Sequence, residues 1–305
     1  MKQLLGKFVF AVLLCAAMIA AHAGHAMAGG SKPPPPAKYP VILAHGMGGF
    51  DKLIGAVPYF YRIPGALRDE GHTVYTTEVS SFNSIAVRGE QLLDQVEEIR
   101  AITGKSKVNI IGHSMGGLDA RYVAHVLGSG KVASVTTMGT PHRGAPAADL
   151  GMLILNGDPT GISTSLLNAI AALFGGVVTN GDLSLPQDMA VQLENLSSPF
   201  LNAWNQQFTN ASGVYYQSYG GTSVFNISLD PSDALLAVTS VLFGFEPNDG
   251  LVGKSSSGWG NQRNLKLNAN HLDEVDQVLG STGLFGLDAR GLYKDIARDL
   301  QKRGY

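Results

Sequence analysis

Apolar and polar positions along this chain follow two alternating patterns. Short apolar runs typical of buried strands occupy residues 39–44, 73–77, 108–111 and 132–138. Residues 86–102 instead place apolar side chains at helical spacing and charged side chains on the opposite face. An order of strand, helix, strand, helix predicts an α/β fold with a mostly parallel central sheet and helices on both faces.

The same alternation continues toward the C-terminus. Apolar runs at residues 214–219 and 265–267 predict two later strands. Helical patterns predict helices over residues 230–243, 271–279 and 288–301. No internal repeat and no second domain is evident, so we expect one α/β domain over residues 29–305.

Residues 145–210 break this pattern, because they are apolar and punctuated by glycine without strand alternation. Within them, residues 162–174 have the spacing of an apolar helix. A compact α/β domain does not need such an insertion, whereas a mobile helical cap over an apolar site does. We therefore predict a lid insertion at about 145–210; the alternative is a buried core helix.

The first 28 residues have the character of a signal peptide. Two lysines precede a continuous apolar run over residues 8–21, and residues 26–28 form a small-x-small cleavage site, with residues 21–23 as a second candidate. The run is short for a membrane span, so we expect a secreted protein without a transmembrane segment; a retained anchor is the alternative. Cys15, the only cysteine, leaves with this segment, so the exported chain has no disulfide.

Charge limits the possible partners. Loss of Lys2 and Lys7 with the signal peptide takes the formal net charge from −2 to −4. A negative balance argues against nucleic acid or strongly anionic surfaces as partners.

Residues 112–116 read Gly-His-Ser-Met-Gly, at the break between the strand at 108–111 and a helical pattern at 118–127. A serine on a sharp strand-to-helix turn is held in a strained conformation with its hydroxyl exposed above the sheet. Glycine is required two residues before and after it, because side chains there would collide across the turn. We interpret Ser114 as a nucleophile; the alternative is a glycine-rich turn with an incidental serine.

A nucleophilic serine needs a base, and in this topology the base comes last in the chain. Only His271 lies far enough after Ser114 to follow the last strands. His113 is on the elbow itself and is expected to point away from the serine. His45 and His142 lie in loops that could line the site, where a structural or substrate-contacting role is expected.

The acid should fall between Ser114 and His271. Asp249 lies in an Asn-Asp-Gly turn after an apolar stretch, where we expect the end of a strand to expose it. Asp230 and Asp233 are competitors, although Asp233 is most simply a first-turn helix acid. The glycine-rich loop at residues 45–50 follows the first strand and is a candidate source of an oxyanion N–H, with a plain turn as the alternative.

Two carboxylates, Asp230 and Asp273, remain near the predicted site. A hard cation with oxygen ligands would keep Asp273 from disturbing His271 two residues earlier. Gln277 and Ser281 follow Asp273 at one-turn intervals, so their carbonyls could face the same point. On spacing alone, we expect Asp230 and Asp273 to be solvated helix caps rather than ligands of an ion.

These motifs together resemble the secreted triacylglycerol lipases of Pseudomonas, Burkholderia and Proteus, which have the α/β-hydrolase fold. The matching stretches span nearly the whole mature chain and are residues 39–50, 87–99, 108–117, 229–236, 248–253 and 270–280. The resemblance implies Ser114, Asp249 and His271 as the triad. It implies oxyanion N–H groups on Met47 and Met115. It also implies a structural calcium ion held by the carboxylates of Asp230 and Asp273 and by main-chain oxygens of Gln277 and Ser281.

One feature departs from part of this family. Its Pseudomonas and Burkholderia members carry a disulfide in the C-terminal half, whereas this chain has no cysteine there and has Ser255 near one of the positions. In this respect the chain is similar to the Proteus branch, which leaves the need for a dedicated foldase and the secretion route open.

The sequence thus predicts a calcium-dependent, secreted triacylglycerol lipase that works through an acyl-enzyme. A carboxylesterase for short, soluble esters would share the chemistry, but it would not need the apolar stretch at residues 145–180. A non-catalytic lipid-binding protein on the same fold is the alternative of another class, although it would have no reason to keep elbow, acid and base together.

Overall fold

The computed structural model describes residues 35–49, 52–53, 57–155, 185–224, 231–280 and 286–305. A six-stranded parallel sheet lies at its centre, in the order β4-β1-β5-β6-β7-β8. The strands are β1 (Val41–Ala44), β4 (Val74–Thr77), β5 (Val108–His113), β6 (Val132–Met138), β7 (Tyr215–Gly221) and β8 (Asn261–Leu267). A separate antiparallel pair, β2 (Lys52–Leu53) and β3 (Val57–Pro58), was not expected from the sequence.

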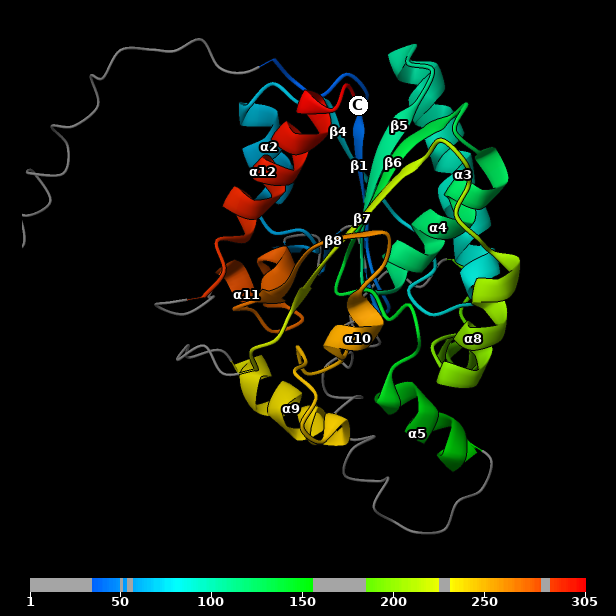
Figure 1. The fold of residues 1–305 in the computed structure, drawn as a ribbon, viewed down its shortest axis with the longest axis vertical. Coiled ribbons are helices and arrows are strands. Elements are labelled where there is room, and N and C mark those ends of the chain that lie inside the picture. Colours follow the sequence, from blue (N-terminus) through cyan, green and yellow to red (C-terminus); the bar gives the residue numbers. More distant parts are fainter. Residues whose placement is uncertain (1–34, 50–51, 54–56, 156–184, 225–230, 281–285) are drawn as a thin grey trace, which may run out of the picture. The chain divides into compact units, whose positions relative to one another are not determined.

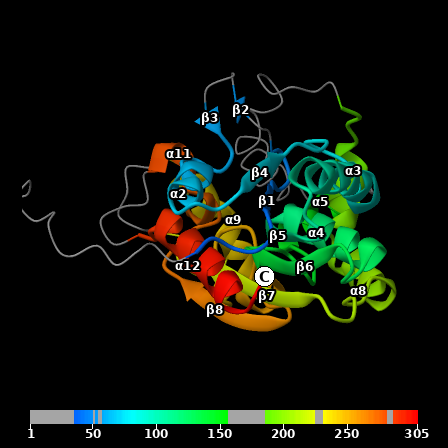
Figure 2. The same cartoon turned by 90° about the horizontal axis from the view of Figure 1, so that it is seen from above.

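Helices cover both faces of the sheet (Figures 1 and 2). α2 (Ile63–Asp69) and α12 (Ala289–Lys302) lie on one face, and α3 (Ile85–Thr103), α4 (Met115–Leu127) and α8 (Ser198–Gln207) on the other. Strand β1 serves both layers, because successive side chains of a strand point to opposite faces. Val41 and Leu43 pack in the core with α2 and α12, whereas Ile42 packs with α3 and α4. The predicted α/β class is confirmed.

The remaining elements gather beyond the carboxyl ends of the strands, where parallel sheets carry their sites. α5 (Pro146–Leu155) and α9 (Pro231–Ser240) lie at this edge in Figure 1. The others are α7 (Met189–Asn195), the 3₁₀ turns η1 (Val241–Phe243) and η2 (Asp273–Val275), α10 (Lys254–Ser257) and α11 (Gln277–Gly280).

Two predicted elements differ from those observed. Instead of one helix over residues 271–279, η2 and α11 are separated by Asp276, whose φ of 58° is left-handed and cannot continue a helix. Residues 59–69 have a helical pattern in the sequence, whereas α2 begins only at Ile63, because Arg62 also has a left-handed φ of 58°.

Several predictions fall outside the described residues. The signal peptide, the helix at 162–174 and two predicted ion ligands, Asp230 and Ser281, belong to this group. The lid insertion and the domain bounds stay predictions. Within the described ranges, no helix combines the length and apolar character needed to cross a membrane.

Candidate active site

Ser114 lies at the end of β5, where the chain turns directly into α4. Its backbone is strained, with φ 54° and ψ −130°, and its N–H donates to the carbonyl of Met138 at 2.8 Å. A Cβ on Gly112 would collide with the backbone of Gly116, and one on Gly116 with the carbonyl of Ala44. The turn therefore has the geometry of a nucleophile elbow.

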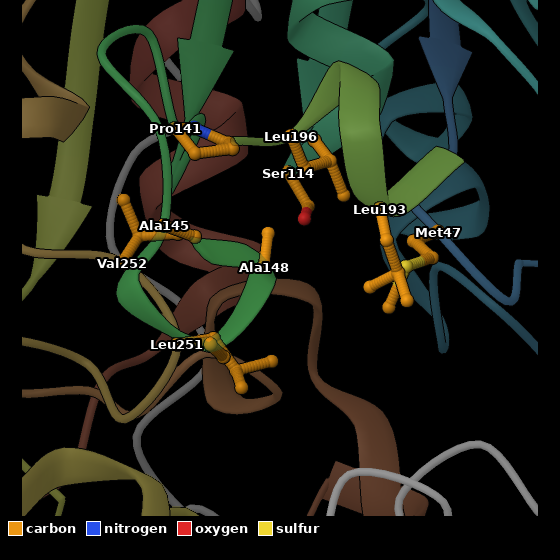
Figure 3. A pocket seen from close by; sticks show the side chains of 10 residues that line it. Met47, Ser114, Pro141, Ala145, Ala148, Leu193, Leu196, Leu251 and Val252 are labelled. Atoms are coloured by element: carbon orange, nitrogen blue, oxygen red, sulfur yellow. The ribbon is translucent and has the colours of Figure 1, made fainter. Parts of the chain in front are cut away.

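The hydroxyl of Ser114 faces an apolar pocket at the carboxyl edge of the sheet (Figure 3). About 490 Å³ of empty space, part of it open to solvent, lies between the residues that line this pocket. Its lining is almost entirely apolar and comprises Met47, Pro141, Ala145, Ala147, Ala148, Leu193, Leu196, Leu251 and Val252, besides Ser114. Such a pocket favours an apolar substrate group next to the serine.

His271 and Asp249 are paired beside this pocket. Nδ1 of His271 lies 2.8 Å from Oδ2 of Asp249, and both side chains are buried. The other carboxylate oxygen, Oδ1, accepts the N–H groups of Leu251 and Val252 at 2.9 and 2.7 Å. The aspartate is thus fixed by a turn whose next residues line the pocket.

The expectation that Asp249 follows a strand is wrong. It comes after η1, in a tight turn closed by a bridge between Asn248 and Gly253. Gly250 has a φ of 99°, which the turn requires and which favours glycine. The competitor Asp233 accepts a hydrogen bond from Nδ2 of Asn270 at 2.7 Å, which places it beside the His271 loop.

Met47 and Met115 carry the two expected oxyanion N–H groups. Met115 is the first residue of α4, so its N–H has no partner within the helix. Within the described part of the chain, neither N–H donates to another residue. Both could therefore serve an oxyanion at Ser114.

Arg88 fixes the loop that contains Met47. Its Nη2 donates to the carbonyl of His45 at 2.8 Å, and its Nε donates to Asp119 of α4 at 2.9 Å. All three side chains are buried. Burial raises the pKa of Asp119 to about 6, although Arg88 acts in the opposite direction. This ion pair ties the loop to the helix that follows the nucleophile.

The other histidines have structural surroundings. His45 donates from Nδ1 to the Gly46 carbonyl and accepts the N–H of Val79 at Nε2. His142 stacks on Trp259 and bonds Thr137, and neither histidine lines the pocket described above. His113, expected to point away from the serine, lies with its ring 4.5 Å from that of His271.

Two buried polar residues beside the site, Tyr59 and Glu274, were not predicted from the sequence. Tyr59 contacts His113, and the Oε2 atom of Glu274 lies 3.2 Å from Nε2 of the same histidine. Burial raises the pKa of Glu274 well above its usual value, and the charges of Asp249 and Asp273 act in the same direction. The sequence feature that could have indicated Glu274 is its position, because it is a charged residue three positions after the predicted base, His271.

The residues predicted to hold calcium are described only in part. The Asp273 carboxylate is buried, and one of its oxygens accepts the N–H of Asn270 at 3.0 Å. A buried carboxylate is an oxygen donor of the kind that a hard cation prefers. Of the predicted ligands, only Asp273 and Gln277 belong to the described residues, whereas Asp230 and Ser281 lie outside them.

Comparisons with known proteins agree with this architecture. Residues 39–229 match the family of the α/β hydrolase fold. The Staphylococcus hyicus lipase structure superposes with a TM-score of 0.64 at 19% identity, over 90% of this chain and 98% of that chain, which supports the fold. The fold therefore defines an α/β hydrolase.

Curated relatives narrow the class. A triacylglycerol lipase of Vibrio cholerae is 38% identical over 88% of this chain and 89% of the relative. A triacylglycerol lipase of Burkholderia plantarii is 36% identical over 88% of this chain and 87% of the relative. The chain belongs to the triacylglycerol lipase family.

Proposed function

We propose that this protein is a secreted lipase that hydrolyses the ester bonds of long-chain triacylglycerols at a lipid–water interface. The observation that carries the proposal is the strained Ser114, whose hydroxyl faces an apolar pocket. An apolar wall next to the nucleophile suits the acyl chain of a fatty ester and offers nothing to a charged substrate.

The reaction begins when Oγ of Ser114 attacks the ester carbonyl while His271 takes the hydroxyl proton. Asp249 holds the Nδ1 proton of the imidazole and stabilises its charged form. The N–H groups of Met47 and Met115 hold the oxyanion. His271 then returns the proton to the departing alcohol, which leaves an acyl-enzyme on Ser114. Water, activated by the same histidine, releases the fatty acid and restores the serine.

Exposed apolar side chains support the interfacial part of the proposal. Phe245 is fully exposed, and Val238 and Val241 of α9 and η1 are also exposed. Leu153 is exposed on α5, which lines the pocket through Ala147 and Ala148. Because α5 contacts η1, these side chains lie on neighbouring elements at one edge of the molecule. An oil surface offers them a partner that water does not.

Calcium would be held by the carboxylates of Asp230 and Asp273 and by main-chain oxygens of Gln277 and Ser281. When bound, the ion supplies a cross-link between the Asp230 region and the loop of His271, in a mature chain without cysteine. Asp273 and its neighbours orient that loop, and the ion takes no part in the bond-making steps.

Export through the signal peptide at residues 1–28 also belongs to this proposal. Hydrolysis should be measured with tributyrin and triolein, below and above the solubility limit of tributyrin. We expect activity on both substrates and a steeper rise in rate once droplets form, because the interface favours an open cap. A hyperbolic curve through the solubility limit, with no activity on triolein, would instead identify a carboxylesterase for short esters.

A further inference from the structure

A buried polar pair lies below the catalytic residues and has no role in the mechanism above. Tyr59 is 7% exposed and His113 is fully buried. They are 54 residues apart in the chain, and their side chains approach to 2.6 Å between the tyrosine hydroxyl and Nδ1 of the histidine. A short bond between two buried neutral groups fixes both side chains.

One end of this pair reaches the proposed base. The ring of His113 lies 4.5 Å from the ring of His271, at an interplanar angle of 43°. Its Nε2 lies 3.2 Å from Oε2 of Glu274, another fully buried group. The imidazole of His271 is therefore held by Asp249 at Nδ1 and is also packed against His113.

The other end reaches the oxyanion loop. A Cβ added to Gly46 would lie 2.9 Å from the Tyr59 hydroxyl and 2.6 Å from Cβ of Ser114. Gly46 is thus confined between the tyrosine and the nucleophile, and it directly precedes Met47, whose N–H is proposed to bind the oxyanion.

A hydrogen bond joins Tyr59 to this loop. Burial raises the pKa of Tyr59, and a hydrogen bond with the main chain of Gly46 opposes that rise. The tyrosine hydroxyl therefore lies between the main chain of Gly46 and Nδ1 of His113.

We propose that Tyr59 and His113 are positioning residues, which together hold the Gly46–Met47 peptide and the ring of His271 in a fixed relation to Ser114. The inference rests on the proposed roles of Met47 and His271. Oxyanion donors act by being in place before charge develops, so a small displacement of this peptide should lower turnover while leaving substrate binding unchanged.

The chain contains a matched control for the tyrosine. Tyr293 is fully buried in the same apolar cluster as Tyr59, and its hydroxyl bonds no described residue. Tyr59→Phe and Tyr293→Phe therefore remove the same atom from the same layer of the protein. Only the first substitution removes a hydrogen-bonded support of the oxyanion loop.

The experiment compares wild type, Tyr59→Phe and Tyr293→Phe on a soluble short-chain nitrophenyl ester. We expect Tyr59→Phe to lower kcat by about 10- to 100-fold with KM within about twofold, and Tyr293→Phe to leave both near wild type. Affinity for an alkyl boronic acid, which forms a tetrahedral adduct on the serine, should fall in Tyr59→Phe by the same factor as kcat/KM.

A second pair of variants tests the histidine and serves if Tyr59→Phe does not fold. In His113→Asn, a polar side-chain atom can take the position of Nδ1 and hydrogen-bond the tyrosine hydroxyl. In His113→Leu, the side chain has no polar atom and this hydrogen bond is lost. We expect His113→Asn to keep more activity than His113→Leu when both melt at similar temperatures.

The inference is overturned if folded Tyr59→Phe has the kcat of wild type, or if the substitution raises KM alone, which would make Tyr59 a substrate contact. Equal activities of His113→Asn and His113→Leu would also overturn it. If wild type neither hydrolyses esters nor binds the boronic acid, the proposed function itself has failed.

Discussion

The imidazole of His271 lies 2.8 Å from Oδ2 of Asp249, and the main-chain N–H of His271 donates to the Asp249 carbonyl at 2.9 Å. Two segments 22 residues apart are thus joined through both side chain and backbone. The side-chain bond sets the tautomer of the histidine, so Nε2 is left as the basic nitrogen.

Replacing Asp249 by Asn should lower kcat by about 10²- to 10⁴-fold without unfolding the protein, because an amide can hold the wrong tautomer of His271. Asp233→Asn is the matched control, since Asp233 is also buried and is bonded to the neighbouring Asn270. Ester hydrolysis and melting temperature should be measured for both. A larger loss of activity in Asp233→Asn would identify Asp233 as the acid.

Ala148 gives the pocket room close to Ser114. Ala148→Leu should shift the preference toward shorter acyl chains, because added methyl groups fill space that a long chain would occupy. We expect the ratio of rates on long- and short-chain nitrophenyl esters to fall at least severalfold. Ala101→Leu, at an exposed position of α3, should leave that ratio unchanged. An unchanged ratio in Ala148→Leu would place the acyl chain elsewhere.

Buried histidines should make the fold sensitive to acid. Burial lowers the pKa of His45 to about 3 and that of His142 well below its usual value. In the unfolded chain both titrate near 6.5, so their contribution to stability is present above that pH and is lost as the pH falls toward the folded values. Each contributes a slope of up to about 1.4 kcal/mol per pH unit to the free energy of unfolding.

The slope can be tested by denaturant unfolding at several values between pH 6 and 4.5. His142→Gln should reduce the pH dependence by about one proton, even if it lowers stability at every pH. His125→Gln, at an exposed position, is the control and should leave the slope as in wild type. An unaltered slope in His142→Gln would mean that His142 is protonated in the folded protein.

Removing calcium should loosen the loop that carries His271. Binding only to the folded state raises the free energy of unfolding by about 2.7 kcal/mol at a hundredfold excess over Kd. Chelation should therefore lower the melting temperature and the activity together, and calcium should restore both better than magnesium.

Asp273→Asn should not respond to calcium, whereas Asp295→Asn, at an exposed position of α12, should respond as wild type does. If the chelated wild type melts at the same temperature and keeps its activity, with the metal shown to be gone, the calcium site is wrong.

The elements that the sequence predicts well are those with strong local patterns. Strand β6 has the predicted bounds, Val132–Met138, because it is a continuous buried run between two turns. Helix α3 agrees within a residue at each end, since Ser84 caps its start and Gly104 ends it with a φ of 65°.

Long-range contacts set the features that could not be predicted. Residues 271–279 have a helical pattern, yet Asn270 accepts the N–H groups of Leu272 and Asp273, and the left-handed Asp276 ends the first turn. Nothing local indicates that Tyr59 meets His113 or that Glu274 lies beside it. The elbow could be predicted because five consecutive residues form it, whereas Tyr59 and Glu274, which contact His113, come from two segments far away in the chain.

The rate of triolein hydrolysis by Ser114→Ala tests the central claim most directly. The substitution removes one oxygen at the pocket and should leave the melting temperature close to that of wild type. Loss of a triad nucleophile costs on the order of 10⁶ in turnover, so we expect activity to fall to the background of the assay. A contaminant-free, folded variant that keeps activity within about tenfold of wild type would contradict the assignment of Ser114 as the nucleophile of this lipase.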